Sequence, residues 1–159
     1  MNPHPIVLTA ASILQRPVFT LSPEQEVLDA VQQLLQRGIS GAPVVVGNKV
    51  VGMFSERDCM AIVASAAYDD EPSGYVQDHM RTTFDAIGPD TDLFSLTMLF
   101  QDSPARRIPV IATDGTLLGV VTRFDLMRGL QQIHRARVDA ERQPARTPYE
   151  RVAEFMASH

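Results

Sequence analysis

Apolar and polar positions follow two periods along this chain, and the same order of periods occurs twice. In the first half, apolar residues recur at helical spacing from Val27 to Leu35, and two short apolar runs follow at 43–46 and 50–54. A turn of Gly47-Asn48-Lys49 separates the two runs, so we expect an antiparallel hairpin there. A second helix is expected to begin near Glu56.

The second half of the chain repeats this order of elements. A helical pattern follows Gly88-Pro89 and extends to Phe100. Apolar runs at 109–112 and 117–121 then predict a second hairpin, and a last helix is expected from Arg123.

A nearly constant offset relates the two halves. Pro43 precedes Pro109 by 66 residues, and Asp58 precedes Asp125 by 67. One extra residue in the second hairpin turn accounts for the difference, and turns accept such insertions readily. The chain is therefore expected to contain two copies of one structural unit.

Each unit is expected to begin with a short strand, at 17–21 in the first copy and 83–87 in the second. The first helix should then start at Ser22, because serine followed by Pro23 and Gln25 has the sequence of a capping box. Each unit therefore has the order strand, helix, strand, strand, helix. One unit of this size forms only a thin core, so the two should pack together, sheet to sheet.

The predicted boundaries place the first repeat at 8–66, an acidic and turn-rich linker at 67–75, the second repeat at 76–131 and a tail at 132–159. The last helix of the second repeat can extend to about Gln143-Pro144. A short helix should follow the capping sequence Thr147–Glu150, with one apolar stripe of Tyr149, Val152, Ala153 and Met156. Such a terminal helix is expected to cover its own domain or to contact a second copy.

Composition excludes several classes of protein. The 159 residues carry a net charge of −5, which argues against a general nucleic-acid binder. The apolar runs are too short to cross a membrane, and the N-terminus lacks the basic start of a secretory signal. Cys59 is the only cysteine, which suits the reducing cytoplasm, and we expect it to be a buried structural thiol. The four histidines are scattered, so no zinc site is expected.

The two units agree best in the motif Gly-x-x-Ser/Thr-x-x-Asp, at 52–58 and 119–125, where a strand is expected to run into a helix. The free N–H groups at a helix start favour an anion. One turn into the helix, the aspartate can accept hydrogen bonds from the two hydroxyls of a ribose, and the neighbouring Arg57 and Arg123 can hold a phosphate. The glycine is expected to leave room for a flat ring.

The same motif also fits a purely structural role. Ser-x-x-Asp before an apolar run is a capping-box sequence, and a cap would recur in a duplicated fold just as a ligand site would. The residues alone therefore leave the function open between a ligand site and a pair of helix caps.

The sequence resembles a tandem pair of CBS domains (a Bateman module). The resemblance covers about residues 8–131 and rests on both motifs together with Gly41-Ala42-Pro43-Val44 and Arg107-Ile108-Pro109-Val110. It implies an α/β fold of two tandem β-α-β-β-α repeats with pseudo-two-fold symmetry, which commonly pairs into a homodimer. We expect no fused catalytic domain, because the chain looks like a stand-alone bacterial protein of this family, and we therefore expect a regulatory rather than an enzymatic role.

Members of the family bind an adenosyl ligand (AMP, ADP, ATP, S-adenosylmethionine or NAD) in two clefts, and an unknown regulated protein is implied as the partner. By resemblance, the ribose would be held by Asp58 and Asp125, and the phosphate or ribose by Ser55 and Thr122. Thr20 and Ala86 would face the adenine, whose apolar wall would be Ala42-Pro43 and Ile108-Pro109. Arg106 and Arg107 are further phosphate candidates, and Ala86 departs from the polar residue often found at its position.

Three functions are compatible with this sequence. The first is a sensor of an adenosyl ligand, and the second is a constitutive dimerisation scaffold whose motifs only cap helices. The third, an enzyme acting on nucleotides, has the least support, because neither Asp58 nor Asp125 has a paired base or nucleophile nearby in sequence. The sensor interpretation fails if both aspartates fold back onto their own main chain and the hollows beside them are too narrow for a purine.

Overall fold

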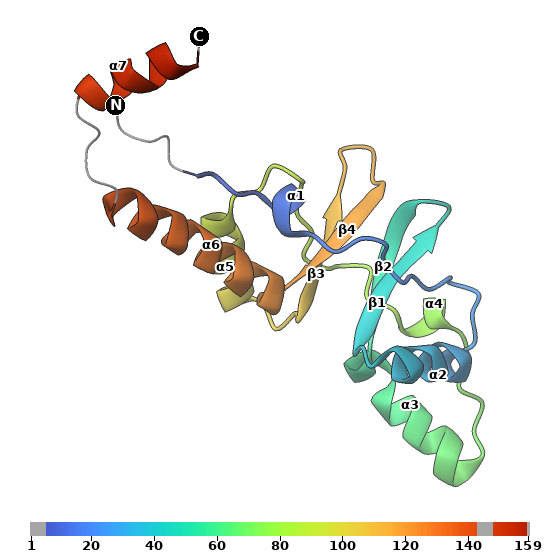
Figure 1. The fold of residues 1–159 in the computed structure, drawn as a ribbon. Coiled ribbons are helices and arrows are strands. Elements are labelled where there is room, and N and C mark those ends of the chain that lie inside the picture. The colour runs from blue at the N-terminus through green and yellow to red at the C-terminus, as the bar shows by residue number, and fades with distance from the viewer. Residues whose placement is uncertain (1–5, 143–147, 159) are drawn as a thin grey trace.

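The computed structural model describes residues 6–142 and 148–158, and it contains two similar units, each with one hairpin and two main helices (Figure 1). The first unit consists of α2 (Val27–Arg37), β1 (Gly41–Val46), β2 (Lys49–Ser55) and α3 (Glu56–Asp69). The second unit consists of α5 (Leu93–Asp102), β3 (Arg107–Ile111), β4 (Leu117–Thr122) and α6 (Arg123–Arg142). The short helices α1 (Ala10–Ile13) and α4 (Val76–His79) precede the two units, and α7 (Pro148–Ala157) follows them. This order confirms the predicted α/β repeat fold and its C-terminal helix.

The two hairpins have matching registers. Gly41 faces Ser55 at the start of the first hairpin, and Arg107 faces Thr122 at the start of the second. Each hairpin also has one irregularity at the same place, after Val44 in β1 and after Val110 in β3. Both predicted hairpins are therefore confirmed, and each delivers its Ser/Thr-x-x-Asp motif to the start of a helix.

The strands predicted ahead of each unit are reduced to single bridges. Leu21 pairs with Val44, and Ile87 pairs with Val110, in both cases in parallel orientation. Each bridge has two backbone hydrogen bonds; Leu21 N–H, for example, donates to the Pro43 carbonyl at 2.9 Å. Only the last residue of each predicted strand therefore joins a sheet.

Helix α2 begins at Val27, so the start predicted at Ser22 is wrong. Residues 22–25 form a turn instead, and the N-cap is Glu26 in an extended conformation. The cause is tertiary, because the segment before α4 pairs with this stretch: the Val27 N–H donates to the Gly74 carbonyl at 3.0 Å, and the Val76 N–H to the Gln25 carbonyl at 2.8 Å. These bonds take backbone groups that a longer helix would have used.

The two units exchange their leading helices. Ala10 of α1 is buried in the core of the second unit, with Leu93, Leu96 and Val121 among its neighbours. Conversely, Val76 of α4 is buried in the core of the first unit, with Phe54 among its neighbours. Each thin core is thus completed by a helix that belongs, in sequence, to the other copy.

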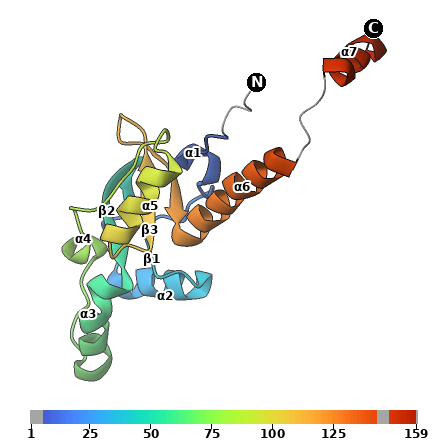
Figure 2. The same cartoon turned by 90° about the vertical axis from the view of Figure 1, so that its left-hand side faces the viewer.

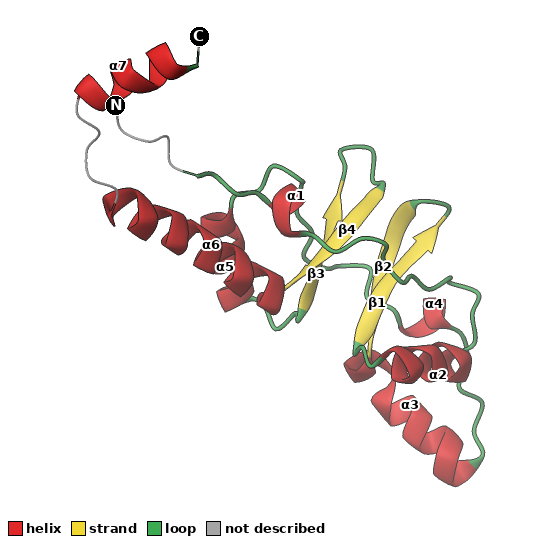
Figure 3. Ribbon diagram, viewed as in Figure 1, coloured by secondary structure: helices red, strands yellow, loops and turns green. Residues whose placement is uncertain are grey.

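The segments that follow these exchanged helices cross directly over the hairpins. Gln15 exchanges two backbone hydrogen bonds with Val120, and Arg81 exchanges two with Met53, which is the pseudo-symmetric pair. The hairpin tips also meet, since the Leu117 N–H donates to the Asn48 carbonyl at 2.9 Å. The two sheets therefore lie side by side, as Figure 3 shows.

The motif glycines allow these crossings. A Cβ atom on Gly52 would lie 2.7 Å from Met80 Sδ and 3.0 Å from the Arg81 carbonyl oxygen, and one on Gly119 would lie 2.8 Å from the Gln15 carbonyl oxygen. The room predicted for a flat ligand ring is therefore filled by the crossing chain. The glycines are needed for the close approach of two backbones.

The tail after the second unit is largely helical. Helix α6 reaches Arg142, close to the predicted limit, and extends away from the hairpins (Figure 2). Tyr149, Val152 and Met156 of the predicted apolar stripe on α7 are all exposed, and Thr147, its expected cap, lies outside the described residues. None of the helices within the described residues is long and apolar enough to cross a membrane.

Candidate ligand-binding site

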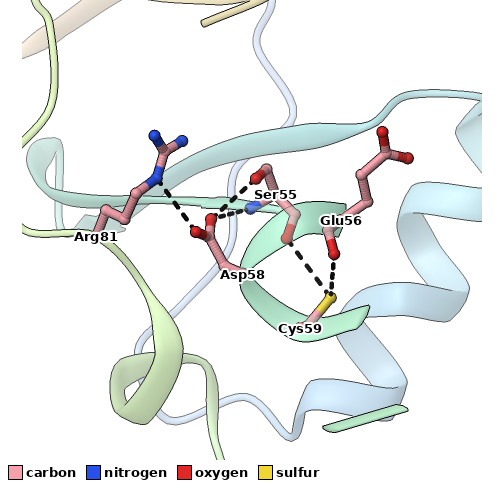
Figure 4. Close-up of polar contacts among 5 residues, drawn as sticks. All are labelled: Ser55, Glu56, Asp58, Cys59 and Arg81. Carbon is pink, nitrogen blue, oxygen red and sulfur yellow. Dashed lines mark hydrogen bonds and ion pairs between the residues drawn. The ribbon is translucent and has the colours of Figure 1, made fainter. Parts of the chain in front are cut away.

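Asp58 lies at the start of α3 and binds back to its own main chain (Figure 4). Its Oδ2 accepts hydrogen bonds from the Ser55 N–H at 2.8 Å and from the Ser55 hydroxyl at 2.9 Å. Its Oδ1 lies 3.2 Å from Nε of Arg81, on the segment that crosses over the hairpin from the second unit. Asp58 is thus a helix cap and at the same time an ion-pair partner across the two units.

Asp125 has the equivalent position in the second unit, at the start of α6. Its Oδ2 accepts from the Thr122 N–H at 2.8 Å and from the Thr122 hydroxyl at 2.7 Å. The neutral side-chain amide of Gln15 donates to both carboxylate oxygens at 3.0 Å. Asp125 is only 6% exposed, and its direct partners are these hydrogen-bond donors, because the described residues place no cation within ion-pair distance of it.

The two copies of the motif therefore differ in one respect that matters for charge. Gln15 and Arg81 occupy equivalent places on the crossing segments, and each one contacts the motif aspartate of the other unit. Arg81 neutralises Asp58, whereas Gln15 leaves the charge of Asp125 in place.

A cleft lies beside Asp58, between the two units. It encloses about 540 Å³, including space open to solvent, and its walls come from Gly41, the 53–57 stretch, Arg81 and the 104–107 stretch. A neighbouring hollow of about 560 Å³ shares Met53, Arg81, Pro104, Ala105 and Arg107 and extends along residues 83–85. The enclosed space that water can enter is smaller, about 70 Å³ in the cleft and about 200 Å³ in the neighbouring hollow, whereas small-molecule sites commonly enclose about 300–1,000 Å³. Both aspartates fold back onto their main chain, and a nucleotide would need the two hollows together, with a displacement of Arg81, which lines both.

Arginine side chains dominate the polar lining of this cleft. The four arginines are Arg57, Arg81, Arg106 and Arg107, and the acidic residues are Glu56 in the cleft and Asp85 in the neighbouring hollow. Arg106 lies 4.0 Å from Glu56 in a largely exposed pair. An anion would therefore enter a region with more guanidinium groups than carboxylates.

Arg107 has an unusual environment within the cleft. Its Nε is buried and has no hydrogen-bond partner among the described residues. Burial lowers the pKa of its guanidinium, and the charge of Asp125 opposes this shift. A buried donor without a partner is uncommon in folded proteins. A bound anion would supply the missing acceptor once the Arg107 side chain turns its Nε toward the cleft.

The structure distributes the predicted site residues over several places. Ser55, Arg57 and Arg107 line the cleft, together with Arg106. Thr122 and Asp125 lie together at the equivalent junction of the second unit. The guanidinium of Arg123 donates to the Ser103 carbonyl at 3.2 Å.

The residues expected around an adenine ring are more widely separated. Ala42, Pro43, Ile108 and Pro109 are completely buried, with Ala42 and Ile108 in the two cores. Thr20 lines a different hollow beside the hairpin tips, together with Arg16 and Asn48. Ala86 is exposed and follows Asp85, which does line the hollow next to the cleft.

Three residues near the cleft were missed by the sequence analysis. Arg81 reaches Asp58 only because its segment crosses over from the other unit. Ser103 is 7% exposed, and its hydroxyl donates to Asp85 at 2.6 Å. The repeat offset offered the one available signal, because it aligns Arg81 with Gln15, the side chain that binds Asp125.

Cys59 follows Asp58 and is buried, as predicted for a structural thiol. Burial raises the pKa of the Cys59 thiol, and the neighbouring charge of Asp58 raises it further. The thiol is thus kept in its protonated, weakly nucleophilic form. Within the described residues, no three His, Cys, Asp or Glu side chains group as a metal site.

The fold and this duplicated junction define a CBS pair. The family model described as CBS domain matches residues 10–65 and 76–132. These two matches cover most of the chain, which therefore belongs to the CBS-domain family.

Relatives of this chain include parts of large enzymes and a small CBS-pair protein. It is 31% identical to an inosine-5'-monophosphate dehydrogenase of Korarchaeum cryptofilum and 30% identical to an A-adding tRNA nucleotidyltransferase of Aquifex aeolicus, over 79% and 80% of its length. It spans only 25% and 15% of those two proteins. The crystal structure of CBSX2 from Arabidopsis thaliana in complex with AMP has 26% identity and a TM-score of 0.69, over 79% of this chain and 98% of that one.

Proposed function

We propose that this chain is a regulatory module that binds an adenosyl ligand in the cleft between its two repeats. The arginine-lined cleft beside Asp58, with the unpartnered Nε of Arg107, is the observation that carries the proposal. The complex of CBSX2 with AMP supports an adenine nucleotide as the ligand class. Similarity to a minor part of two larger enzymes supports an accessory role rather than a catalytic one.

The interlocked repeats give binding a means of acting on the whole module. One wall of the cleft comes from the first repeat, at 53–57, and the other from the second, at 104–107. A ligand that contacts both walls favours one relative position of the repeats, and a partner protein that distinguishes these positions would receive the signal. We propose that the module acts in the cytoplasm as a homodimer and that the buried Ala42, Pro43, Ile108 and Pro109 support the cleft from behind its walls, whereas Thr20 lines a separate hollow.

A constitutive scaffold is the second candidate function. It is favoured by the capping geometry, because both motif aspartates already bind the N–H and hydroxyl of Ser55 or Thr122. In a scaffold, the motif would only stabilise two helix starts, and the arginines would be a solvated surface.

Thermal melting separates the two functions. A ligand that binds only the folded state at 100 times its Kd adds about 2.7 kcal/mol to its stability, which for a chain of this size raises Tm by about 5–10 °C. We expect a shift of this order with at least one of AMP, ATP, S-adenosylmethionine and NAD, and no shift with free ribose as the control. If none of the four raises Tm at millimolar concentration, the scaffold function is correct.

A further inference from the structure

We propose that the cleft beside Asp58 selects adenosyl ligands that carry phosphate, and that Arg81 makes this selection by exchanging Asp58 for the phosphate when the ligand enters. This inference rests on the proposed function and narrows its ligand class. It assigns a specificity-determining role to a residue that the motif itself does not contain.

The Asp58 carboxylate has little free capacity to accept hydrogen bonds from a ligand. Its Oδ2 already accepts two hydrogen bonds from Ser55, and its Oδ1 faces Arg81 at 3.2 Å. A carboxylate has about four acceptor positions, so little capacity remains for a ribose diol. A ligand that uses Asp58 must therefore compete with Arg81 for Oδ1.

Arg81 is the member of the Arg81–Asp58 pair that can move. Its side chain is 45% exposed, whereas that of Asp58 is 11% exposed and held by Ser55. Arg81 also lines both hollows, so its guanidinium borders the space that a ligand would occupy. Released from Asp58, it reaches an anion in the same cleft without leaving its segment.

A ligand that enters the cleft meets an excess of positive charge. Arg57, Arg106 and Arg107 line the same cleft, and the described residues place no carboxylate within ion-pair distance of Arg57. A phosphate gives a partner to Arg57, and to Arg81 once it has left Asp58, whereas Arg106 already lies 4.0 Å from Glu56. Adenosine displaces Arg81 without replacing its anion, and the sulfonium of S-adenosylmethionine adds a positive charge to a positive site.

The second repeat provides an internal comparison for this role. Gln15 contacts Asp125 from the equivalent place but carries no charge. The substitution Arg81→Gln therefore reproduces, beside Asp58, an arrangement that this fold already contains. Arg135→Gln on α6 removes one exposed arginine outside the cleft and serves as the matched charge control.

Calorimetric titration of adenosine, AMP, ATP and S-adenosylmethionine at one fixed ionic strength tests the proposal. For the unmodified protein, we expect AMP and ATP to bind at least about tenfold more tightly than adenosine or S-adenosylmethionine. Arg81→Gln should reduce the AMP-to-adenosine affinity ratio about fivefold or more, Arg81→Lys should retain most of it, and Arg135→Gln should leave it within about twofold. Melting curves without ligand establish that each variant is folded.

Different outcomes separate this inference from the function on which it rests. If none of the four ligands binds the unmodified protein, the proposed function itself fails. If adenosine or S-adenosylmethionine binds as tightly as AMP, or if the folded Arg81→Gln protein keeps the original ratio, the function stands and the role of Arg81 is refuted.

Discussion

Replacing Gly119 by alanine should lower the free energy of unfolding by about 1–3 kcal/mol, the usual effect of forcing extra atoms into a packed site. The added Cβ would lie 2.6 Å from Leu14 Cδ1 and 2.8 Å from the Gln15 carbonyl oxygen, so a backbone segment has to move. Gly52→Ala should have a smaller effect, because the backbone oxygen it faces, that of Arg81, lies at 3.0 Å and its closer contact at 2.7 Å is the flexible Met80 side chain. Urea unfolding monitored by circular dichroism measures both changes.

Gly88→Ala is the matched control for these two variants. A Cβ atom on Gly88 meets no atom within 4 Å, and its φ lies outside the left-handed range, so alanine should be neutral or slightly stabilising. If Gly119→Ala changes the free energy of unfolding no more than Gly88→Ala does, the close crossing of the two backbones does not exist in solution.

Asp125→Ala should lower the free energy of unfolding by about 1–3 kcal/mol, because it removes the acceptor of several partly buried hydrogen-bond donors. The N–H and hydroxyl of Thr122 and the amide of Gln15 would all lose their partner. Asp58→Ala should cost less stability, since its pair with Arg81 is partly exposed, but it should abolish the shift in Tm that an adenosyl ligand produces. Thermal unfolding of each variant with and without AMP measures both its stability and its ligand-induced shift in Tm.

Asp92→Ala separates capping from ligand binding. Asp92 caps α5 by accepting hydrogen bonds from the Ser95 N–H at 2.9 Å and the Ser95 hydroxyl at 2.8 Å, and it lies outside the cleft. This variant should lose stability while keeping the full ligand-induced shift. If Asp58→Ala behaves in the same way as Asp92→Ala, the aspartate of the first motif is only a helix cap.

The hairpins and both motif junctions could be predicted because their signals are local. A turn between two β-branched runs determines a hairpin over a few residues, and an offset of 66 or 67 residues shows that it occurs twice. The start of α2 could not be predicted in this way, because bonds between Val27 and Gly74 and between Val76 and Gln25 override the local capping sequence.

The residues that line the cleft were harder to predict from the sequence than the repeated motif was. Ser55 and Arg57 were found because they belong to a repeated pattern. Arg81 acquires its role from the exchange of leading helices between the units, and no periodicity within one unit shows such an exchange. The glycine of the motif was interpreted as room for a ligand, and only the position of the crossing chain shows what fills that room.

A crystal structure of the chain grown with saturating AMP decides whether the cleft beside Asp58 holds a nucleotide. We expect density for the nucleotide between residues 53–57 and 104–107, with its ribose within hydrogen-bond distance of Asp58 and its phosphate within reach of Arg107 Nε. A cleft that holds only solvent, with Asp58 still paired to Arg81 at saturating AMP, would contradict this expectation.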